Sequence, residues 1–169
     1  FEACLYRLPE GLSFEEAAAL PLVSLTALQA LRDLAHLRPG DRVAIHGASG
    51  GVGTVAIQIA KALGAHVTTT SSAKNLELCS SLGADEALDY AKNELFDGRF
   101  RVVFDVYGNL SFGRVKRALT AGGVFISTVP SARILLDAAL TLRADKRAKL
   151  IVIRSRREDL DAVTDLVRR

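Results

Sequence analysis

The sequence predicts an α/β protein with a doubly wound, six-stranded parallel sheet and helices on both faces. Short apolar segments alternate with segments of helical periodicity over most of the 169 residues. Several of these apolar segments are continuous rather than alternating, as in strands that are buried on both faces. A cluster of glycines also separates the first strand of this series from the first helix. Strands that alternate with helices in this way are typical of parallel sheets.

The first 41 residues precede this alternation. A short strand is expected in "ACLYRLP", ending at Pro9. Ser13 and Glu16 have the spacing of a capping box, so a mostly apolar helix is expected to begin there. Pro21 is expected to break or bend this helix, because proline removes a helical hydrogen bond. The turn "LRPGD", residues 37–41, then leads into the alternating part.

Six strands and six helices are expected after this turn, which is about one domain with a buried core. The predicted strands cover residues 42–47, 66–70, 86–90, 101–107, 123–129 and 150–154. The predicted helices cover residues 52–63, 74–82, 91–96, 111–120, 132–142 and 157–168.

Composition excludes several classes of function. The basic residues gather in "RADKRAKLIVIRSRR", residues 143–157, without the interleaved aromatic residues of a nucleic-acid surface, so no nucleic-acid partner is expected. No apolar run approaches the roughly 20 residues that cross a bilayer, so no membrane partner is expected. Cys4 and Cys79 lie far apart without a pairing motif. We therefore expect reduced thiols and a cytoplasmic location.

Four glycines lie where the first strand of this series meets the first helix, in "RVAIHGASGGVG". Gly47 is expected to permit the tight turn out of the strand, and Gly53 to let the helix pack closely on the sheet. Gly50 and Gly51 would let the backbone approach a pyrophosphate without a Cβ atom in the way. A strand, a glycine-rich turn and a helix form the setting of a dinucleotide-binding fingerprint. The sequence therefore predicts a Rossmann fold.

The first turn of that helix carries the predicted phosphate contacts. The amides of Gly51, Val52 and Gly53 are expected to point at the anion, where the helix dipole favours negative charge. Ser49, in the same loop, is a further candidate for binding the cofactor. The structural alternative is a glycine-rich turn without a ligand.

Four stretches together resemble a known family: "LSFEEAAALPLVSLTALQAL", "GDRVAIHGASGGVGTVAIQIAKALGAHV", "SLGADEALDY" and "VVFDVYG". The GxxGxxG spacing over residues 47–53 has one residue more than the common GxGxxG. These stretches resemble the cofactor domain of medium-chain dehydrogenases/reductases, and most of all the zinc-independent quinone oxidoreductases, the zeta-crystallin-like proteins. The resemblance covers residues 1–130 and is loose after Pro130.

The resemblance implies that the substrate pocket lies between this domain and a barrel-like domain that precedes residue 1. Residues 1–36 would be the end of that catalytic domain with a connecting helix, and residues 37–169 the NADP(H)-binding Rossmann domain. The chain would then hold the cofactor half of an active site, and we expect little turnover from it alone. A homodimer through the sheet edge is expected. No catalytic residue is assigned, and Asp105 is interpreted as a satisfied buried carboxylate rather than a base.

The end of the second predicted strand favours NADP(H) over NAD(H). An NAD site usually places an Asp or Glu there, whereas no carboxylate lies between His66 and Asn75. Ser71 and Ser72 offer hydroxyl groups to a 2′-phosphate, and Lys74 offers a positive charge. The alternative is that Ser72 only caps the next helix and Lys74 is a solvated charge.

Four more residues are candidates for contacting the cofactor. The resemblance implies that Tyr90 packs near the adenosine phosphate and that Thr26 contacts the nicotinamide. Gly108 would let the adenosine or ribose lie close above the fourth strand, and Thr128 lies at the carboxyl end of the fifth. By itself, Thr26 could instead bond its own helix backbone, and Gly108 could be a simple turn.

No metal is expected. In zinc alcohol dehydrogenases of the same superfamily, a ligand cysteine lies four residues before the threonine that corresponds to Thr26, and Leu22 occupies that position. The three histidines, His36, His46 and His66, are scattered singly without ligand spacing.

The resulting hypothesis is an NADPH-dependent oxidoreductase that transfers a hydride to a small quinone or enone-type acceptor. An enoyl-thioester reductase of the same fold is an alternative, since the part that contacts the substrate would lie outside this chain. A non-catalytic NADP(H)-binding module is a second alternative.

Overall fold

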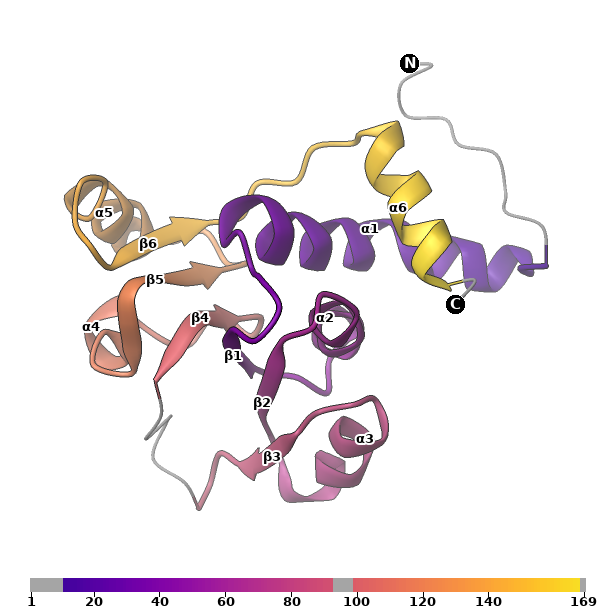
Figure 1. The fold of residues 1–169 in the computed structure, drawn as a ribbon, viewed down its shortest axis with the longest axis horizontal. Helices are drawn as coiled ribbons and strands as arrows, with labels where there is room; N and C mark the ends of the chain where they lie inside the picture. The colour runs from indigo at the N-terminus through magenta and orange to yellow at the C-terminus, as the bar shows by residue number, and fades with distance from the viewer. Residues whose placement is uncertain (1–10, 93–98, 168–169) are drawn as a thin grey trace.

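The computed structural model describes residues 11–92 and 99–167, and Figure 1 shows its arrangement. Six parallel strands form one sheet in the order β3-β2-β1-β4-β5-β6. The strands are β1 Arg42–His46, β2 His66–Ser71, β3 Glu86–Asp89, β4 Phe100–Asp105, β5 Leu119–Ser127 and β6 Arg147–Leu150. The helices are α1 Phe14–Leu28, α2 Gly51–Ala62, α3 Leu76–Ser81, α4 Phe112–Val115, α5 Ala132–Leu140 and α6 Arg157–Val167. A π-helix η2, Gln29–Leu34, continues α1, and a 3-10 turn η3, Ala73–Asn75, precedes α3. The predicted fold class is confirmed.

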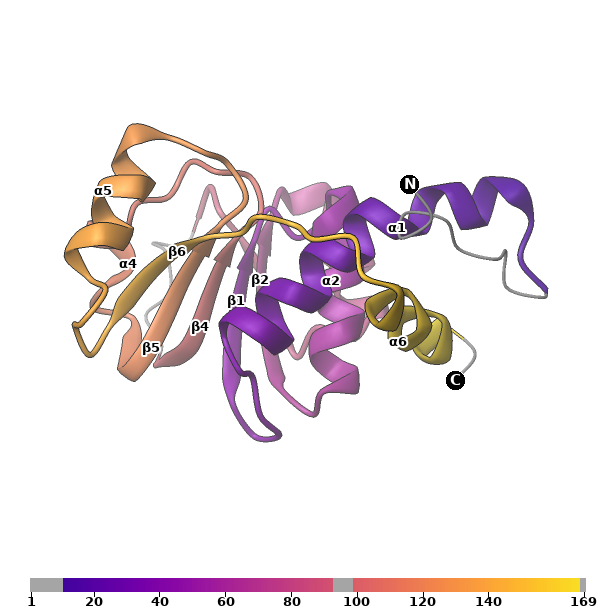
Figure 2. The ribbon, with the colours of Figure 1, turned by 90° about the horizontal axis from the view of Figure 1, so that it is seen from above.

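Helices cover both faces of the sheet, as Figure 2 shows from above. Val43 and Ile45 of β1 point into a core shared with α1, η2 and α2, with α6 packed beside α1. Ala44, between them, points into the opposite core beneath α4 and α5. Strands buried on both faces have continuous apolar sequences, which is why most of them could be predicted from apolar runs. No helix in the described ranges is long and apolar enough to span a membrane.

The capping box at the start of α1 is confirmed. The Glu16 amide donates to Ser13 Oγ at 3.2 Å, and the Ser13 amide donates to the Glu16 carboxylate at 2.9 Å. The backbone hydrogen bond from Ser13 lowers the pKa of Glu16. The expected break at Pro21 is absent, since α1 is helical through that residue. This half of α1 is largely exposed, so solvent can bond the carbonyl that lacks the proline amide.

Several predicted helix and strand boundaries were wrong, because pairing with a neighbouring strand determines where these elements begin and end. The last strand is β6, residues 147–150, rather than 150–154, because Arg147 pairs in register with Val124. The helix expected at 111–120 is the single turn α4, since Leu119 already pairs with Phe100 in β5. The first predicted strand, which ended at Pro9, and most of the helix predicted at 91–96 lie outside the described residues.

A buried polar contact ties the end of the chain to the first helix. The side chain of Asp159 in α6 is 3% exposed, and it accepts hydrogen bonds from Gln29 Nε2, at 2.8 Å, and from the Arg32 guanidinium. Gln29 also bonds both backbone groups of Arg154. A buried carboxylate needs such partners to offset its lost hydration. These contacts position α6 against α1 and η2.

We expect Gly53→Ala to lower the free energy of unfolding by about 1–3 kcal/mol through overpacking. A Cβ atom at Gly53 would lie 2.6 Å from three backbone atoms of Ala48, which cannot move aside cheaply. In the matched variant Gly51→Ala, the new Cβ would meet only Val23 Cγ1, at 3.5 Å, and helix propensity would add up to about 1 kcal/mol. Urea unfolding of both variants gives the comparison, and equal stabilities would contradict the packing argument.

Candidate cofactor-binding site

A cleft of about 630 Å³ opens at the carboxyl ends of the strands. It spans the point where the chain order reverses, between β1 and β4, which is where open α/β sheets bind ligands. Its lining residues come from the ends of β1 to β4 and from α4: His46, Gly47, Ser49, Gly50, Ser71, Ser72, Tyr90, Tyr107, Asn109, Leu110 and Arg114. Its volume suits a ligand of cofactor or drug size.

The glycine-rich loop brings the start of α2 to this cleft. Gly50 is the N-cap, and the Thr54 amide donates the first helical hydrogen bond, to Gly50 at 2.9 Å. The amides of residues 51–53 precede that bond, so no helical carbonyl accepts from them, and the helix dipole favours an anion at this end. Gly50 belongs to the described lining of the cleft, whereas Gly51, Val52 and Gly53 do not, and Gly53 is buried. The first turn of α2 contains no acidic side chain that would repel one.

Two glycines of the loop are required by the fold itself. Gly47 has a φ of +77°, and a Cβ atom there would lie 3.0 Å from Tyr107 Cβ. Gly53 lies on the backbone of Ala48, which confirms that it lets α2 pack closely. Gly50, by contrast, has open space, because a Cβ atom there would meet only the Gly47 carbonyl, at 3.5 Å. Gly50 is therefore the glycine at which a side chain would fill the cleft and leave the fold intact.

Ser71, Ser72 and Tyr90 line the cleft on the β2 and β3 side. Asn75 Nδ2 donates to Ser49 Oγ at 2.9 Å and to Ser72 Oγ at 3.2 Å, which links this side to the glycine loop. No acidic residue belongs to the described lining on this side. The hydroxyl groups can thus accept or donate to a phosphate without a competing carboxylate.

Lys74 is exposed and does not line the cleft. Ser72 occupies the N-cap position of η3, although its side chain makes no capping hydrogen bond. Instead, Arg114 of α4 is the cationic residue among the described lining of the cleft. Sequence reasoning missed Arg114, because only the fold brings α4 opposite Ser71 and Ser72.

His46 joins three strand ends beneath the cleft. Its ring nitrogens lie 2.6 Å from Thr70 Oγ1 (Nδ1) and 2.8 Å from Asn109 Oδ1 (Nε2). A carboxamide oxygen only accepts, so Nε2 carries a proton and donates it to Asn109. His46 therefore orients the Asn109 carboxamide, whose Nδ2 remains available at the cleft. His46 was not predicted as a site residue, since the three histidines were considered only as metal ligands.

Asp105 shapes the loop after β4, which supplies Tyr107 and Asn109. It is fully buried and accepts hydrogen bonds from the amides of Gly108, at 2.7 Å, and Leu110, at 2.8 Å. Its carboxylate oxygens are bonded to the loop, as expected for a satisfied buried carboxylate, and it takes no part in lining the cleft.

Three further candidates lie outside the cleft. Gly108 has a φ of +85°, and a Cβ atom there would be 2.3 Å from Val129 Cγ2, so the fold requires glycine in this turn. Thr26 is buried and donates to the Leu22 carbonyl at 2.6 Å. Thr128 donates to the Val106 carbonyl at 2.9 Å. Both hydroxyl protons therefore bond the backbone.

The described residues contain no group of three or more His, Cys, Asp or Glu side chains that could hold a metal ion. Leu22 is 69% exposed on α1. Cys79 is a free thiol buried in the core, away from the cleft.

Residues 51–168 match the zinc-binding dehydrogenase family. The chain belongs to this family. It is the cofactor-binding domain of a medium-chain dehydrogenase/reductase, similar to the quinone oxidoreductases, which confirms the resemblance seen in the sequence.

Among its relatives, the zinc-type alcohol dehydrogenase-like protein of Schizosaccharomyces pombe is 42% identical over 127 residues, covering 72% of this chain and 37% of that protein. The chloroplast envelope quinone oxidoreductase homolog of Arabidopsis thaliana is 34% identical over 174 residues, covering 95% and 53%. A trans-enoyl reductase of Aspergillus terreus is 46% identical over 88 residues, covering 52% and 25%.

The similar solved structures also include quinone oxidoreductases and an enoyl reductase. The quinone oxidoreductase of Coxiella burnetii has a TM-score of 0.83 at 32% identity, covering 94% of this chain and 50% of that one. The CurK enoyl reductase has a TM-score of 0.72 at 29% identity, covering 95% and 49%. The quinone oxidoreductase of Thermus thermophilus, also solved with NADPH, has a TM-score of 0.68 at 32% identity, covering 95% and 52%. The chain thus spans about half the length of these enzymes.

Proposed function

We propose that this chain binds NADP(H) and supplies the cofactor half of an oxidoreductase active site. The observation that carries this proposal is the 630 Å³ cleft at the switch point, which is lined by Gly50, the N-cap of α2. The amides of residues 51–53 would bind the diphosphate. When bound, the nicotinamide supplies the hydride, while the protein provides position and electrostatics. The solved complex of the Thermus thermophilus relative with NADPH supports the choice of ligand.

The proposed acceptor is a quinone or an enone-type double bond. Quinone oxidoreductases are among the structural neighbours, and so is an enoyl reductase, which makes an enoyl-thioester the alternative acceptor. A non-catalytic NADP(H)-binding module is the remaining alternative. Residues 1–36 would include the end of a catalytic domain and its connecting helix, and the acceptor pocket would lie against that domain. The test is the oxidation of NADPH by the longer protein that contains this chain. Turnover with a quinone, with an enoyl thioester or with neither would support the quinone reductase, the enoyl reductase or the non-catalytic module, respectively.

The preference for the 2′-phosphate form rests on the charge of the cleft. Ser71, Ser72 and Tyr90 line its β2 and β3 side without a carboxylate, and Arg114 lies across from them. Lys74 follows Ser72 in an exposed turn, from which its flexible side chain would have to reach in. Thr26, Gly108 and Thr128 remain proposed contacts through the resemblance alone. The buried free thiol of Cys79 supports a reducing location such as the cytoplasm.

Gly50→Val is expected to abolish binding of NADPH while the chain stays folded. The added methyl groups would occupy the space in front of the α2 amides, and a Cβ atom at Gly50 clashes with nothing in the fold. Isothermal titration calorimetry measures the affinity, and circular dichroism the fold. Gly113→Val is the matched control, since a Cβ atom there also meets open space, near Arg133. Unchanged affinity in Gly50→Val would refute the diphosphate assignment.

The native chain is expected to bind NADPH about tenfold or more tightly than NADH, since a charge-assisted contact is worth roughly 1.5–3 kcal/mol. Arg114→Gln and Lys74→Gln, titrated with both nucleotides, show which cation contacts the 2′-phosphate, because only that variant loses the preference. Arg117→Gln, an exposed cation just after α4, is the control. Equal affinities in the native chain would overturn the choice of cofactor.

No stoichiometric zinc is expected in the purified chain, and activity of the longer protein should survive EDTA or phenanthroline. Leu22 occupies the position at which the resemblance implies a ligand cysteine in zinc alcohol dehydrogenases. Without such a ligand, the site suits conjugated, already polarised acceptors better than simple aldehydes. Elemental analysis that finds about one zinc per chain would contradict this, and with it the preference for quinones.

We also propose a homodimer through the β6 edge of the sheet. Exposed apolar side chains surround that edge: Leu135, Leu136, Leu140, Leu142 and Val152. Such a patch beside an open strand edge marks a surface for association. Analytical ultracentrifugation should show a dimer that Val152→Glu dissociates, whereas the distant Val167→Glu leaves it intact. A monomeric native chain at high concentration would exclude this interface.

A further inference from the structure

Three cationic side chains of strands β4 and β6 lie outside the lining of the cofactor cleft. Arg147 and Lys149 belong to β6, where they pair in register with Val124 and Ile126. The side chains of Val124 and Ile126 lie in the core beneath α1 and α2, so Arg147 and Lys149 point to the same face. Lys149 Nζ accordingly donates to the Leu34 carbonyl of η2, at 2.7 Å.

Arg101, near the start of β4, completes the cluster. Its guanidinium donates to the Gly122 carbonyl, just before the residues of β5 that pair with Arg147. Gly122 leaves open space there, because a Cβ atom would meet only Arg101 Nη1, at 3.9 Å. We call Arg101, Arg147 and Lys149 the basic cluster.

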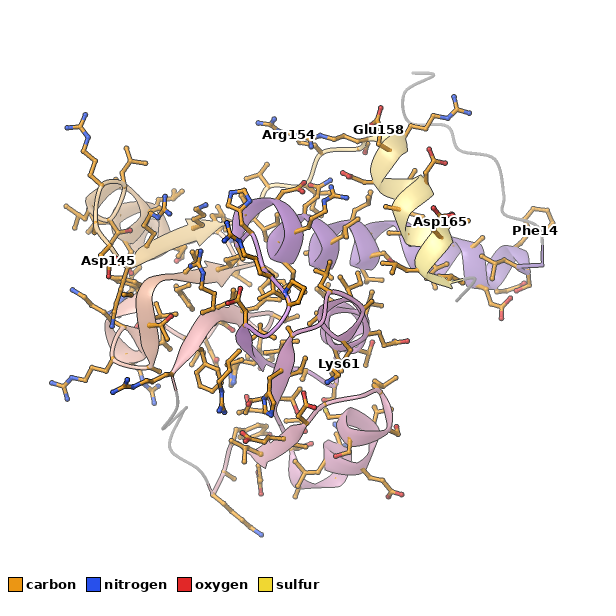
Figure 3. All side chains as sticks on the ribbon, in the orientation of Figure 1. Phe14, Lys61, Asp145, Arg154, Glu158 and Asp165 are labelled. Atoms are coloured by element: carbon orange, nitrogen blue, oxygen red, sulfur yellow. The ribbon has the colours of Figure 1, made fainter. Side chains whose placement is uncertain are left out.

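The three side chains of the basic cluster are half-buried. Arg147 Nε is buried and has no hydrogen-bond partner. Burial, and then the charges of Arg147 and Arg101, lower the pKa of Lys149. None of the three forms an ion pair with a carboxylate in the described part of the chain. Asp145, at the turn before β6 (Figure 3), instead accepts the Gly122 amide at 2.8 Å.

A purely structural role explains only part of this arrangement. Lys149 compensates the carbonyl end of η2, where a cation is favourable. The hydrogen bond from Lys149 to Leu34 does not provide an acceptor for Arg147 Nε. It also places the charge of Lys149 beside those of Arg101 and Arg147. Half-buried like charges are costly without a partner, and a buried orphan donor in a folded protein usually marks a missing water or ion.

We propose that the basic cluster binds a small oxyanion of the phosphate or sulfate type, at a site separate from the cofactor cleft. A tetrahedral oxyanion can accept paired hydrogen bonds from guanidinium groups and one from an ammonium group. It would give Arg147 Nε its acceptor and offset the repulsion among the three cations. The inference does not depend on NADP(H) binding, since none of the three cations belongs to the described lining of the cofactor cleft.

The test is a sulfate titration of the chain followed by two-dimensional amide NMR, with chloride replaced so that ionic strength is constant. The amides of Gly122, Gly123 and Arg147 should shift and saturate together. Amide shifts confined to residues 50–53 would assign the anion to the α2 N-terminus and overturn the proposal. Linear shifts without saturation would also overturn it, since they report general screening. Inorganic phosphate and glycerol 3-phosphate are titrated in the same way. Tighter binding of inorganic phosphate would indicate a free anion, and tighter binding of glycerol 3-phosphate an anion carried by a larger molecule.

The variant Arg147→Gln/Lys149→Gln should weaken sulfate binding at these amides about tenfold or more, as charge-assisted hydrogen bonds are lost. Arg117→Gln, which removes an exposed cation outside the cluster, should leave it unchanged. If the double variant loses its dispersed spectrum, Lys149→Met keeps the buried stem and removes one charge. Equal sulfate affinity in the folded variants and the native chain would refute the site. NADPH affinity should be the same in all of them, which separates this test from that of the cofactor cleft.

Discussion

The close approach of Gly53 to the backbone of Ala48 determines where α2 begins, and much of the cleft depends on it. At a separation that leaves no room for a Cβ atom, the helix can start immediately after the loop, with its N-cap Gly50 at the cleft. A helix held farther from the strands would move its positive end away from Ser71 and Ser72. The packing requirement and the electrostatic property of this site therefore arise from the same missing side chain.

The other wall of the cleft depends on buried polar groups instead. Asp105 holds the loop after β4 through two amides, and His46 holds Asn109 within that loop. Asp105 is fully buried and His46 nearly so, and both determine which atoms of the loop face the cleft. A rigid helix start thus opposes a loop fixed by hydrogen bonds, which is a preorganised arrangement for a long, flexible ligand.

The sequence predicted the parts of this structure that depend on local chemistry. The capping box, the glycine loop and the first five strands of the sheet follow from the preferences of neighbouring residues, and each overlaps its predicted position. Pairing between distant segments could not be predicted in the same way. The residues of β6 alternate between polar and apolar, so the more apolar stretch after Leu150 was predicted as the strand instead. The helix α4 is shorter than predicted because Leu119 pairs with Phe100. Arg114, His46 and Asn109 belong to the cleft only through the fold, and nothing in their local sequence distinguishes them.

The π-helix η2 has a consequence for how changes in length are tolerated. Its wider turn sets the directions in which Gln29 and Arg32 leave the helix, and both reach Asp159 from there. Deleting one residue of this turn would restore ordinary helical winding and rotate the two side chains relative to one another and to the sheet by about 100°. Asp159 would then be left buried without its partners. The wider turn of η2 therefore keeps Gln29 and Arg32 directed at Asp159 of α6. An insertion or deletion in this short segment should for that reason destabilise the chain far more than its position between a helix and a loop suggests.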